Sequence, residues 1–389
     1  MILARLILAL ALALFALPIP AQAQVCGDVD GSGTVEVTDV LVLLQHVVNG
    51  DPLACTACPI CGTTTTTTST TTLSSTSSTS STTTTTTTLQ PLCGELLLAW
   101  GQRGADEGSF VTPAGVAVDT ENKVYVIEAG NRRVQKFDDQ GVFLRTWGDL
   151  TGGDGQFSIP QGIAVSSGRD VYEADTGFSQ IQRFRHAGRF LDRWGKSGTD
   201  DGEFDEPTAV AIGVEELEDP DAPGELVETD VVYVVESNNS RVQKFTGDGT
   251  LLDGWGRRGG AGGRMRDPLG IAVGPDGSVW VADTGNHRIQ KFDPSGRFLA
   301  QFGARGRADG QFEAPSGIAL DADGNIFVAD TGNNRIQRFD PEGVFVAAWG
   351  GFGREEGRLD TPHGIAVAAG GIIYVADEGN HRIQKFSCP

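Results

Sequence analysis

Six oxygen-bearing residues near the amino terminus have the spacing of a twelve-residue calcium loop. Counted from Asp28, oxygen donors stand at positions 1, 3, 5, 7, 9 and 12, and Gly33 at position 6 permits the sharp turn. The donors are Asp28, Asp30, Ser32, Thr34 through its carbonyl, Glu36 and Asp39. The alternative is a polar turn before the apolar helix expected over 40–49. We expect this segment to bind calcium.

The six cysteines could bind metal or form disulfides. Cys55, Cys58 and Cys61 form a CxxCxxC run, and with Cys26 they could hold zinc. A secreted chain favours disulfides, because the compartment is oxidising. The pairing among these four cysteines stays open.

Histidine is the residue most often used as a metal ligand or a general base, and the chain has five. His287 and His381 lie in repeated GNHR turns, so we expect structural roles for them. His363 has no counterpart in the other repeats and is a candidate ligand-binding residue. GxSxG, HExxH and P-loop signatures do not occur in a structural setting that would support their chemistry. We therefore predict no catalytic residue.

Residues 1–23 carry the pattern of a secretory signal. Arg5 precedes an apolar run over 6–17, and 21–23 has the small residues of a cleavage site. An uncleaved anchor is the alternative, but the run falls short of the roughly 20 residues that span a bilayer. We expect a secreted chain without a membrane span, extracellular, at the cell surface or periplasmic.

The rest of the chain divides by composition. Residues 63–88 are Thr and Ser apart from Leu73, and such a stretch cannot form a core. We therefore expect a calcium module with four cysteines at 24–62, a disordered linker at 63–92 and a repeat domain at 93–389. This last region holds 46 acidic against 29 basic residues, a charge that repels nucleic acid and anionic lipid.

The repeat domain has a period of 47 residues. An aromatic-Gly pair recurs at Trp100, Trp147, Trp194, Trp255, Phe302 and Trp349, and a proline recurs at Pro113, Pro160, Pro207, Pro268, Pro315 and Pro362. The third repeat is 14 residues longer, and residues 213–230 within it hold eight acids and no Lys or Arg. We expect this insertion to be a mobile acidic loop between the first two strands.

Each unit contains four short apolar runs separated by turn residues, which we name strands a, b, c and d. In the fourth unit they are 270–273, 278–282, 288–292 and 297–302. Four-stranded units of this length are propeller blades. The sequence predicts an all-β, six-bladed β-propeller, with a small helical calcium module before it.

The segments PLGIAVGPDGSVWVADTGNHRIQKFDPSGRFLAQFG at 268–303 and YVADEGNHRIQKF at 374–386 resemble the NHL repeat, and the resemblance covers about three quarters of the chain. The second blade departs most, since Phe178, Ser179 and Gln180 stand where 286–288 reads Asn, His and Arg. The segment 27–50 resembles one dockerin repeat, which implies a cohesin-like partner. A second dockerin repeat is absent, because the cysteine run takes its place.

Enzymes that resemble NHL proteins in fold place metal ligands at the mouth of the central channel. The residues after the recurring prolines are Ala114, Gln161, Thr208, Leu269, Ser316 and His363. One histidine does not meet the need of a peptide α-amidating lyase for several, and strands a lack the acids of a calcium-dependent lactonase. We therefore predict a monomeric, non-catalytic protein that binds a protein or glycan ligand through Phe178, Gln180 and His363. A propeller enzyme of the lyase or lactonase type is the alternative.

Two further features of the repeats are expected to hold the scaffold. An acid precedes every b–c turn (Glu128, Asp175, Glu236, Asp283, Asp330, Asp377), and in five blades an arginine begins strand c (Arg133, Arg241, Arg288, Arg335, Arg382). We expect a turn and ion-pair framework.

The repeats begin with a lone d strand at 95–100 and end with strands a, b and c. Pairing of the first strand with the last would complete the sixth blade. Alignment with the fourth blade puts Cys93 and Cys388 at adjacent turn positions, so a disulfide between them is expected. The alternative is that Cys93 pairs within the 55–61 cluster and Cys388 stays free.

Overall fold

The computed structural model describes residues 93–149, 153–218, 222 and 224–388. The predicted signal, calcium module and linker lie outside the described residues, and so does the expected helix at 40–49. Within the described residues, no helix has the length and hydropathy that crossing a bilayer requires.

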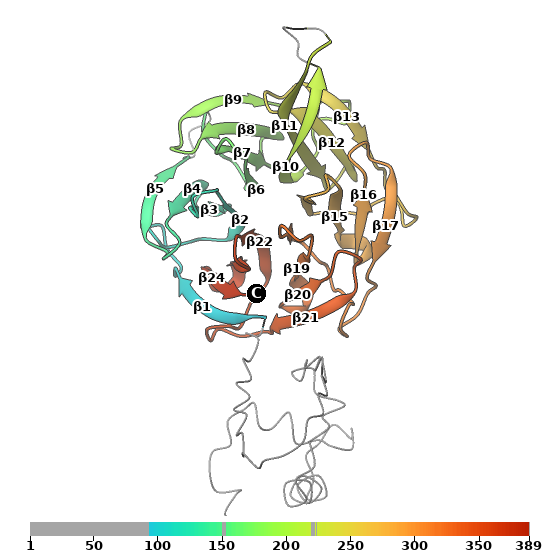
Figure 1. Cartoon of the computed structure of the whole chain (residues 1–389). Helices are drawn as coiled ribbons and strands as arrows, with labels where there is room; N and C mark the ends of the chain where they lie inside the picture. Colours follow the sequence, from blue (N-terminus) through green and yellow to red (C-terminus); the bar gives the residue numbers. More distant parts are fainter. Residues whose placement is uncertain (1–92, 150–152, 219–221, 223, 389) are drawn as a thin grey trace, which may run out of the picture. The chain divides into compact units, whose positions relative to one another are not determined.

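Six four-stranded antiparallel sheets surround a central axis, as predicted (Figure 1). Blade 1 contains β2 (Pro113–Val118), β3 (Val124–Glu128), β4 (Arg133–Phe137) and β5 (Phe143–Trp147). Blade 2 contains β6 (Pro160–Val165), β7 (Asp170–Asp175), β8 (Gln180–Arg185) and β9 (Phe190–Trp194). Blade 3 contains β10 (Pro207–Glu218), β11 (Leu226–Glu236), β12 (Arg241–Thr246) and β13 (Leu251–Trp255).

The remaining blades carry a short 3-10 helix in each b–c turn. Blade 4 contains β14 (Gly270–Val273), β15 (Val279–Asp283), η1 (Thr284–Asn286), β16 (Arg288–Phe292) and β17 (Phe298–Phe302). Blade 5 contains β18 (Ile318–Leu320), β19 (Ile326–Asp330), η2 (Thr331–Asn333), β20 (Arg335–Phe339) and β21 (Phe345–Gly350). Blade 6 contains β22 (Pro362–Ala368), β23 (Ile372–Asp377), η3 (Glu378–Asn380), β24 (Arg382–Ser387) and β1 (Glu95–Trp100).

The core lies between neighbouring blades. Strand b is buried on both faces, and successive side chains point to opposite faces, so one strand serves two blade interfaces. In blade 2, Val171 packs toward blade 1 with Tyr125 and Ile127, whereas Tyr172 packs toward blade 3 with Val232. A fully buried side chain from each loop before strand a completes the packing: Phe110, Phe157, Phe204, Met265, Phe312 and Leu359.

The insertion in blade 3 differs from the prediction of a mobile loop. It extends β10 and β11 into a two-stranded hairpin that remains in register from Gly213 opposite Val231 to Glu218 opposite Leu226 (Figure 1, top). Its location between strands a and b is as predicted. The acidic count suggested a loop, but apolar residues recur along both strands, and cross-strand pairing satisfies the backbone groups.

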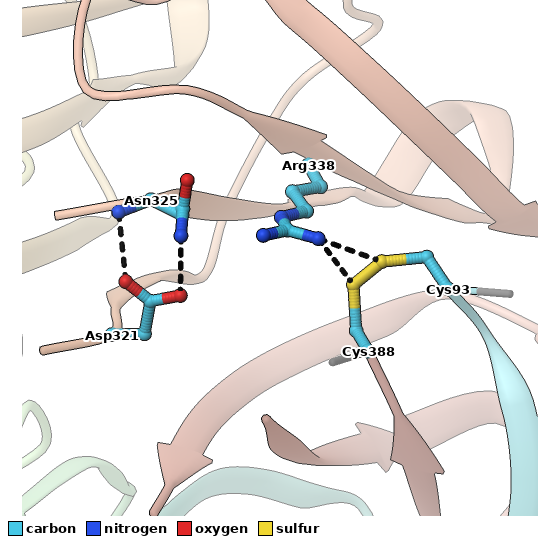
Figure 2. Close-up of a disulfide and its surroundings, with 5 residues drawn as sticks. All are labelled: Cys93, Asp321, Asn325, Arg338 and Cys388. Carbon is cyan, nitrogen blue, oxygen red and sulfur yellow. Dashed lines mark hydrogen bonds between the residues drawn. A yellow bond between two sulfur atoms is a disulfide. The ribbon is translucent and has the colours of Figure 1, made fainter. Parts of the chain in front are cut away.

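Strands from the two ends of the chain complete blade 6. β1 pairs with β24, with Glu95 opposite Ser387 and Trp100 opposite Ile383. The structure joins Cys93 to Cys388, with their Cα atoms 4.0 Å apart (Figure 2). Arg338 Nη1 donates to both sulfur atoms at 3.4 Å.

This contact repeats a pattern seen elsewhere in the ring. In blades 1, 2, 3 and 6, the cation at the same position of strand c donates to a backbone carbonyl in the c–d turn of the next blade. These carbonyls belong to His186, Gly247, Pro294 and Asp139. Cys388 occupies the equivalent position. The Cys388–Cys93 junction therefore replaces a c–d turn.

Candidate functional site

The six a strands surround a narrow space on the propeller axis, with a volume of about 70 Å³. Its lining is mostly backbone and apolar, with polar side chains from Gln161, Thr208 and His363. Backbones approach closely here, since a Cβ at Gly317 would collide with the carbonyl oxygen of His363. Five of the six residues after the recurring prolines line this space, namely Ala114, Gln161, Thr208, Leu269 and His363. The sixth, Ser316, is buried, and its hydroxyl is hydrogen-bonded to that of Thr331.

His363 links two blades. Its Nδ1 lies 3.1 Å from the carbonyl oxygen of Ala114 in blade 1, a hydrogen bond across the closure of the ring. Across the described residues, no three side chains of the His, Cys, Asp and Glu types gather closely enough to hold a metal ion. A ligand-binding role for His363 stays a prediction.

The predicted framework of acids and arginines is present in five blades. In blade 4, Asp283 is fully buried and accepts hydrogen bonds from Arg288 Nε at 2.7 Å and Asn286 Nδ2 at 2.9 Å. Gln290 Nε2 donates to the same carboxylate at 2.9 Å. The corresponding ion pairs in blades 1, 3, 5 and 6 measure 2.6, 2.6, 2.8 and 2.7 Å.

The same arginines fasten the loop that leads from strand d to strand a. Arg288 Nη1 donates to the carbonyl of Gly260 at 2.9 Å, and Nη2 donates to those of Ala261 and Arg264 at 2.9 and 2.8 Å. The b–c turns and the d–a loops therefore share one face of the propeller. We call it the b–c face.

His287 and His381 belong to this scaffold, as expected. Each occupies a left-handed backbone position, at φ of 56° and 54°. His287 Nδ1 accepts a hydrogen bond from the backbone N–H of Ala314 at 3.0 Å, and His381 Nδ1 accepts one from that of Thr112 at 3.3 Å. Both contacts join a turn to the next blade.

Blade 2 lacks this framework. Gln180 replaces the arginine and Phe178 replaces the asparagine, while Asp175 stays fully buried. The Asp175 carboxylate accepts backbone N–H groups from Ser158 at 3.0 Å and Ile159 at 3.1 Å. Burial raises the pKa of Asp175, and these hydrogen bonds oppose the shift.

The two side chains that replace the framework in blade 2, Gln180 and Phe178, differ in their burial. Gln180 is 7% exposed, and its buried Nε2 has no hydrogen-bond partner. Phe178 is 44% exposed and Ile159, which lies on the adjoining loop, is 47% exposed. Predicted residues Phe178 and Gln180 thus come together on the b–c face. His363 lies at the channel, at the start of strand a.

Glu173 is a candidate that the sequence analysis missed. Its side chain is fully buried between blades 1 and 2, where the aligned residue in the other blades is valine (Val126, Val234, Val281, Val328, Val375). Trp147 Nε1 donates to Oε1 at 3.2 Å, and Oε2 has no partner. Burial raises the pKa of Glu173 well above its usual range; the Trp147 bond opposes this, and the Asp175 carboxylate adds to it. Comparison of the six b strands residue by residue could have found it.

The repeated sequence and the four-stranded blades agree with a known repeat family. The model of the NHL repeat matches residues 110–137, 265–292, 312–339 and 359–386, in blades 1, 4, 5 and 6. These four blades are NHL repeats. Protein brain tumor of Drosophila melanogaster is 43% identical over 44 residues, which are 11% of this chain and 4% of that protein.

Solved structures share the fold at low identity. A protein of unknown function from Bacteroides thetaiotaomicron is 17% identical with a TM-score of 0.53, over 75% of this chain and 76% of that one. A streptogramin B lyase is 18% identical with a TM-score of 0.51, over 75% of this chain and 97% of the lyase. At this identity the likeness concerns the fold alone.

Proposed function

We propose that this NHL propeller is a secreted, non-catalytic binding protein that presents the b–c face of blade 2 to a protein or glycan ligand. The supporting observation is that Phe178 and Gln180 replace the asparagine and the arginine of the framework. Five blades use these positions to fasten a loop, and blade 2 instead places a half-exposed aromatic ring beside a buried polar pair. Residues that give up a stabilising role at one repeat are candidates for binding.

The charge of the propeller narrows the class of ligand. Residues 93–389 carry 46 acidic and 29 basic side chains, so the surface favours neutral or basic partners. The exposed side chains of Ile159 and Phe178 offer an apolar contact. A polypeptide with basic and apolar residues fits both features better than an acidic glycan or a polyanion.

The amino-terminal segment supplies the proposed attachment. The oxygen donors at Asp28, Asp30, Ser32, Thr34, Glu36 and Asp39 would bind calcium, and the ordered loop would engage a cohesin-like partner. Residues 63–92 would separate that module from the propeller. In this arrangement one end of the chain anchors the protein and the other binds the ligand.

An enzyme of the propeller lyase or lactonase type is the second candidate. The observation that favours it is the shared fold with a streptogramin B lyase. Fold alone carries no chemistry. Zinc and calcium analysis of the purified chain, together with assays on lactone and cyclic ester substrates, would test it. Turnover that depends on a channel residue such as His363 would favour the enzyme.

A peptide selection tests the binding function. The full secreted chain would be immobilised and a random peptide library selected on it, with a glycan array in parallel. Phe178→Asn restores the residue of the other blades, and Leu144→Thr removes a similarly exposed apolar side chain from β5 as a matched control. We expect selected binders to lose at least about tenfold in affinity for Phe178→Asn and less than about twofold for Leu144→Thr.

Equal affinity for wild type and Phe178→Asn across all selected peptides and glycans would overturn the proposal. Failure to select any binder in either library would also count against it.

A further inference from the structure

We infer that the loop between blades 3 and 4 is a cationic docking site on the b–c face, and that it takes an acidic segment of a protein partner. The site consists of Arg257, Arg258, Arg264 and Arg266, which we call the arginine patch. The inference rests on the proposed function, because it assigns a second contact to a protein ligand on the same face.

The patch departs from the other repeats in its charge. Residues 256–267 carry four arginines and one acid, a net charge of +3. The aligned loops carry net charges of −1, −2, −4, 0 and −1 at 101–112, 148–159, 195–206, 303–314 and 350–361. Near the tip, these five loops have an acid where this loop has Gly262; the acids are Glu107, Asp154, Asp201, Asp309 and Glu356. One loop of an acidic domain has therefore lost an acid and gained arginines.

The fold brings the four arginines together at the surface. They belong to two short segments, 257–259 and 264–266, which are joined by hydrogen bonds. The amide of Met265 donates to the carbonyl of Arg257 at 3.1 Å, and the amide of Gly259 donates to the carbonyl of Met265 at 2.9 Å. Met265 is fully buried, whereas all four arginine side chains are exposed. The patch therefore surrounds a residue that is fixed in the core.

The backbone of the loop is held by the framework of blade 4. Asn286 Nδ2 donates to the carbonyl of Gly259 at 2.9 Å, and Gln290 Nε2 donates to that of Arg264 at 2.8 Å. These bonds add to the three that Arg288 donates to the same loop. The arginines of the patch are thus presented on a backbone that is already ordered, which lowers the cost of binding.

Most of the positive charge of the patch is unbalanced. Arg258 Nη2 lies 3.7 Å from Asp267 Oδ1, in a pair whose side chains are 67% and 47% exposed. Among the described residues, no carboxylate oxygen lies within 4.0 Å of a side-chain nitrogen of Arg257, Arg264 or Arg266. Like charges that gather without partners repel one another, and a bound anion would relieve this repulsion.

The surroundings of the patch favour a short acidic segment over a long polyanion. The next loop around the ring, 195–206, has a net charge of −4 and would repel a nucleic acid or an anionic polysaccharide that extended toward it. Residues 256–267 contain no aromatic residue on which a base could stack. Arginine binds a carboxylate through two parallel hydrogen bonds, so a few acidic side chains of a polypeptide would satisfy the patch.

The charges of the b–c face suit a partner that carries both signs. The acidic loops at 148–159 and 195–206 attract basic residues of the partner, and the arginine patch attracts its acidic ones. Such a pattern specifies the orientation in which the partner docks, because a reversed arrangement would bring like charges together.

The test uses fluorescence anisotropy on the full secreted chain. The probe is a fluorescein-labelled peptide of repeated Glu-Glu-Ser units, and its Gln-Gln-Ser counterpart is the uncharged comparison. Arg264→Gln combined with Arg266→Gln is the patch variant, which removes two charges from the site. Arg145→Gln combined with Arg189→Gln removes two exposed arginines from blades 1 and 2 and is the matched control.

We expect saturable binding of the acidic peptide, with an affinity that falls at least about tenfold in the patch variant. The control variant should change the affinity by less than about twofold, and added salt should weaken binding to wild type. The unfolding midpoint of the patch variant should equal that of wild type or rise, since repulsion is relieved. Absence of saturable binding, equal binding of the uncharged peptide, equal losses in the two double variants, or a lower midpoint would overturn the inference.

Polyanions test the choice of ligand class. Single-stranded DNA and a heparin oligosaccharide are titrated under the same conditions. Tighter binding of either one than of the acidic peptide, lost in the patch variant, would overturn the assignment to a protein partner.

Phe178→Asn separates the two proposals, and it should leave binding of the acidic peptide unchanged. Library binders that require Phe178 but bind the patch variant as well as wild type would leave the binding function in place and remove the second contact. Binders that are insensitive to Phe178 would remove the binding function itself.

Discussion

Asp175 and Gln180 face each other at the end of the β7–β8 pair, where the other five blades place an acid and its arginine. The acid is retained and fully buried, yet its cationic partner is gone. One blade of a repeating scaffold therefore carries a local cost in stability that its neighbours avoid. This relationship links the fold to the proposed binding function.

Conversion of a normal blade to the blade 2 arrangement measures that cost. Arg288→Gln leaves Asp283 buried without its ion pair and removes one donor from each of the carbonyls of Gly260, Ala261 and Arg264. We expect the free energy of unfolding to fall by about 3 kcal/mol, measured by chemical denaturation. Arg305→Gln, which breaks an exposed pair with Glu313, is the control and should change stability by less than about 0.5 kcal/mol. Equal effects of the two variants would contradict the framework.

Replacement of Glu173 by valine should stabilise the protein. The substitution restores the residue of the other five blades and removes a buried carboxyl group whose Oε2 has no partner. Trp147 would then be like Trp100, Trp194, Trp255 and Trp349, whose buried indole N–H groups have no partner. We expect a gain of about 2 kcal/mol at pH 7 by denaturant unfolding. Destabilisation of the Glu173→Val variant would contradict this prediction.

The raised pKa of Glu173 makes the stability of the folded protein depend on pH. Because this pKa is raised in the folded state, the folded protein holds a proton that the unfolded chain releases above the ordinary value of 4.5. The contribution of Glu173 to stability is therefore present below pH 4.5 and is lost as pH rises toward the folded pKa. Glu173→Gln should remove this loss, so its advantage over wild type should grow from pH 4 to pH 8. A constant difference would contradict the shift.

The closing disulfide predicts a specific cross-link. Peptide mapping without reduction should recover Cys93 joined to Cys388. Cys93 joined to Cys26, Cys55, Cys58 or Cys61 would refute it. Because the bond closes a loop with a separation of 295 residues, its loss in a Cys93→Ser, Cys388→Ser variant should lower stability by up to about 5 kcal/mol.

Calcium binding by the amino-terminal loop is an independent prediction. Titration of the full secreted chain with calcium should release heat at one site, since clustered carboxylates repel until a cation neutralises them. Asp28→Ala together with Asp39→Ala should remove the signal. Heat that persists in this variant, or its absence in wild type at millimolar calcium, would exclude the site.

The repeats made much of the fold predictable. In blade 4 the expected strands differ from the observed ones by at most one residue at each end, because turn residues mark every boundary. The pairing of β1 with β24 also followed from counting strands. The hairpin of blade 3 differs from the expected loop, because apolar residues recur along 214–218 and 226–232 and the two strands pair despite their acidic side chains.

The candidate site was only partly predictable. Phe178 and Gln180 were visible as departures from the repeat. Glu173 was overlooked, because one acid in an apolar strand is conspicuous only beside the aligned valines. The lack of a partner for the buried Gln180 Nε2 depends on the packing around Asp175, which no residue type encodes.

One measurement tests most directly whether blade 2 has exchanged stability for binding. Phe178→Asn combined with Gln180→Arg rebuilds the framework of the other blades, and the unfolding midpoint and the affinity for a selected peptide are measured on the same variant. We predict that the midpoint rises while the affinity falls by at least about tenfold. A lower midpoint, or an affinity equal to that of wild type, would contradict the account.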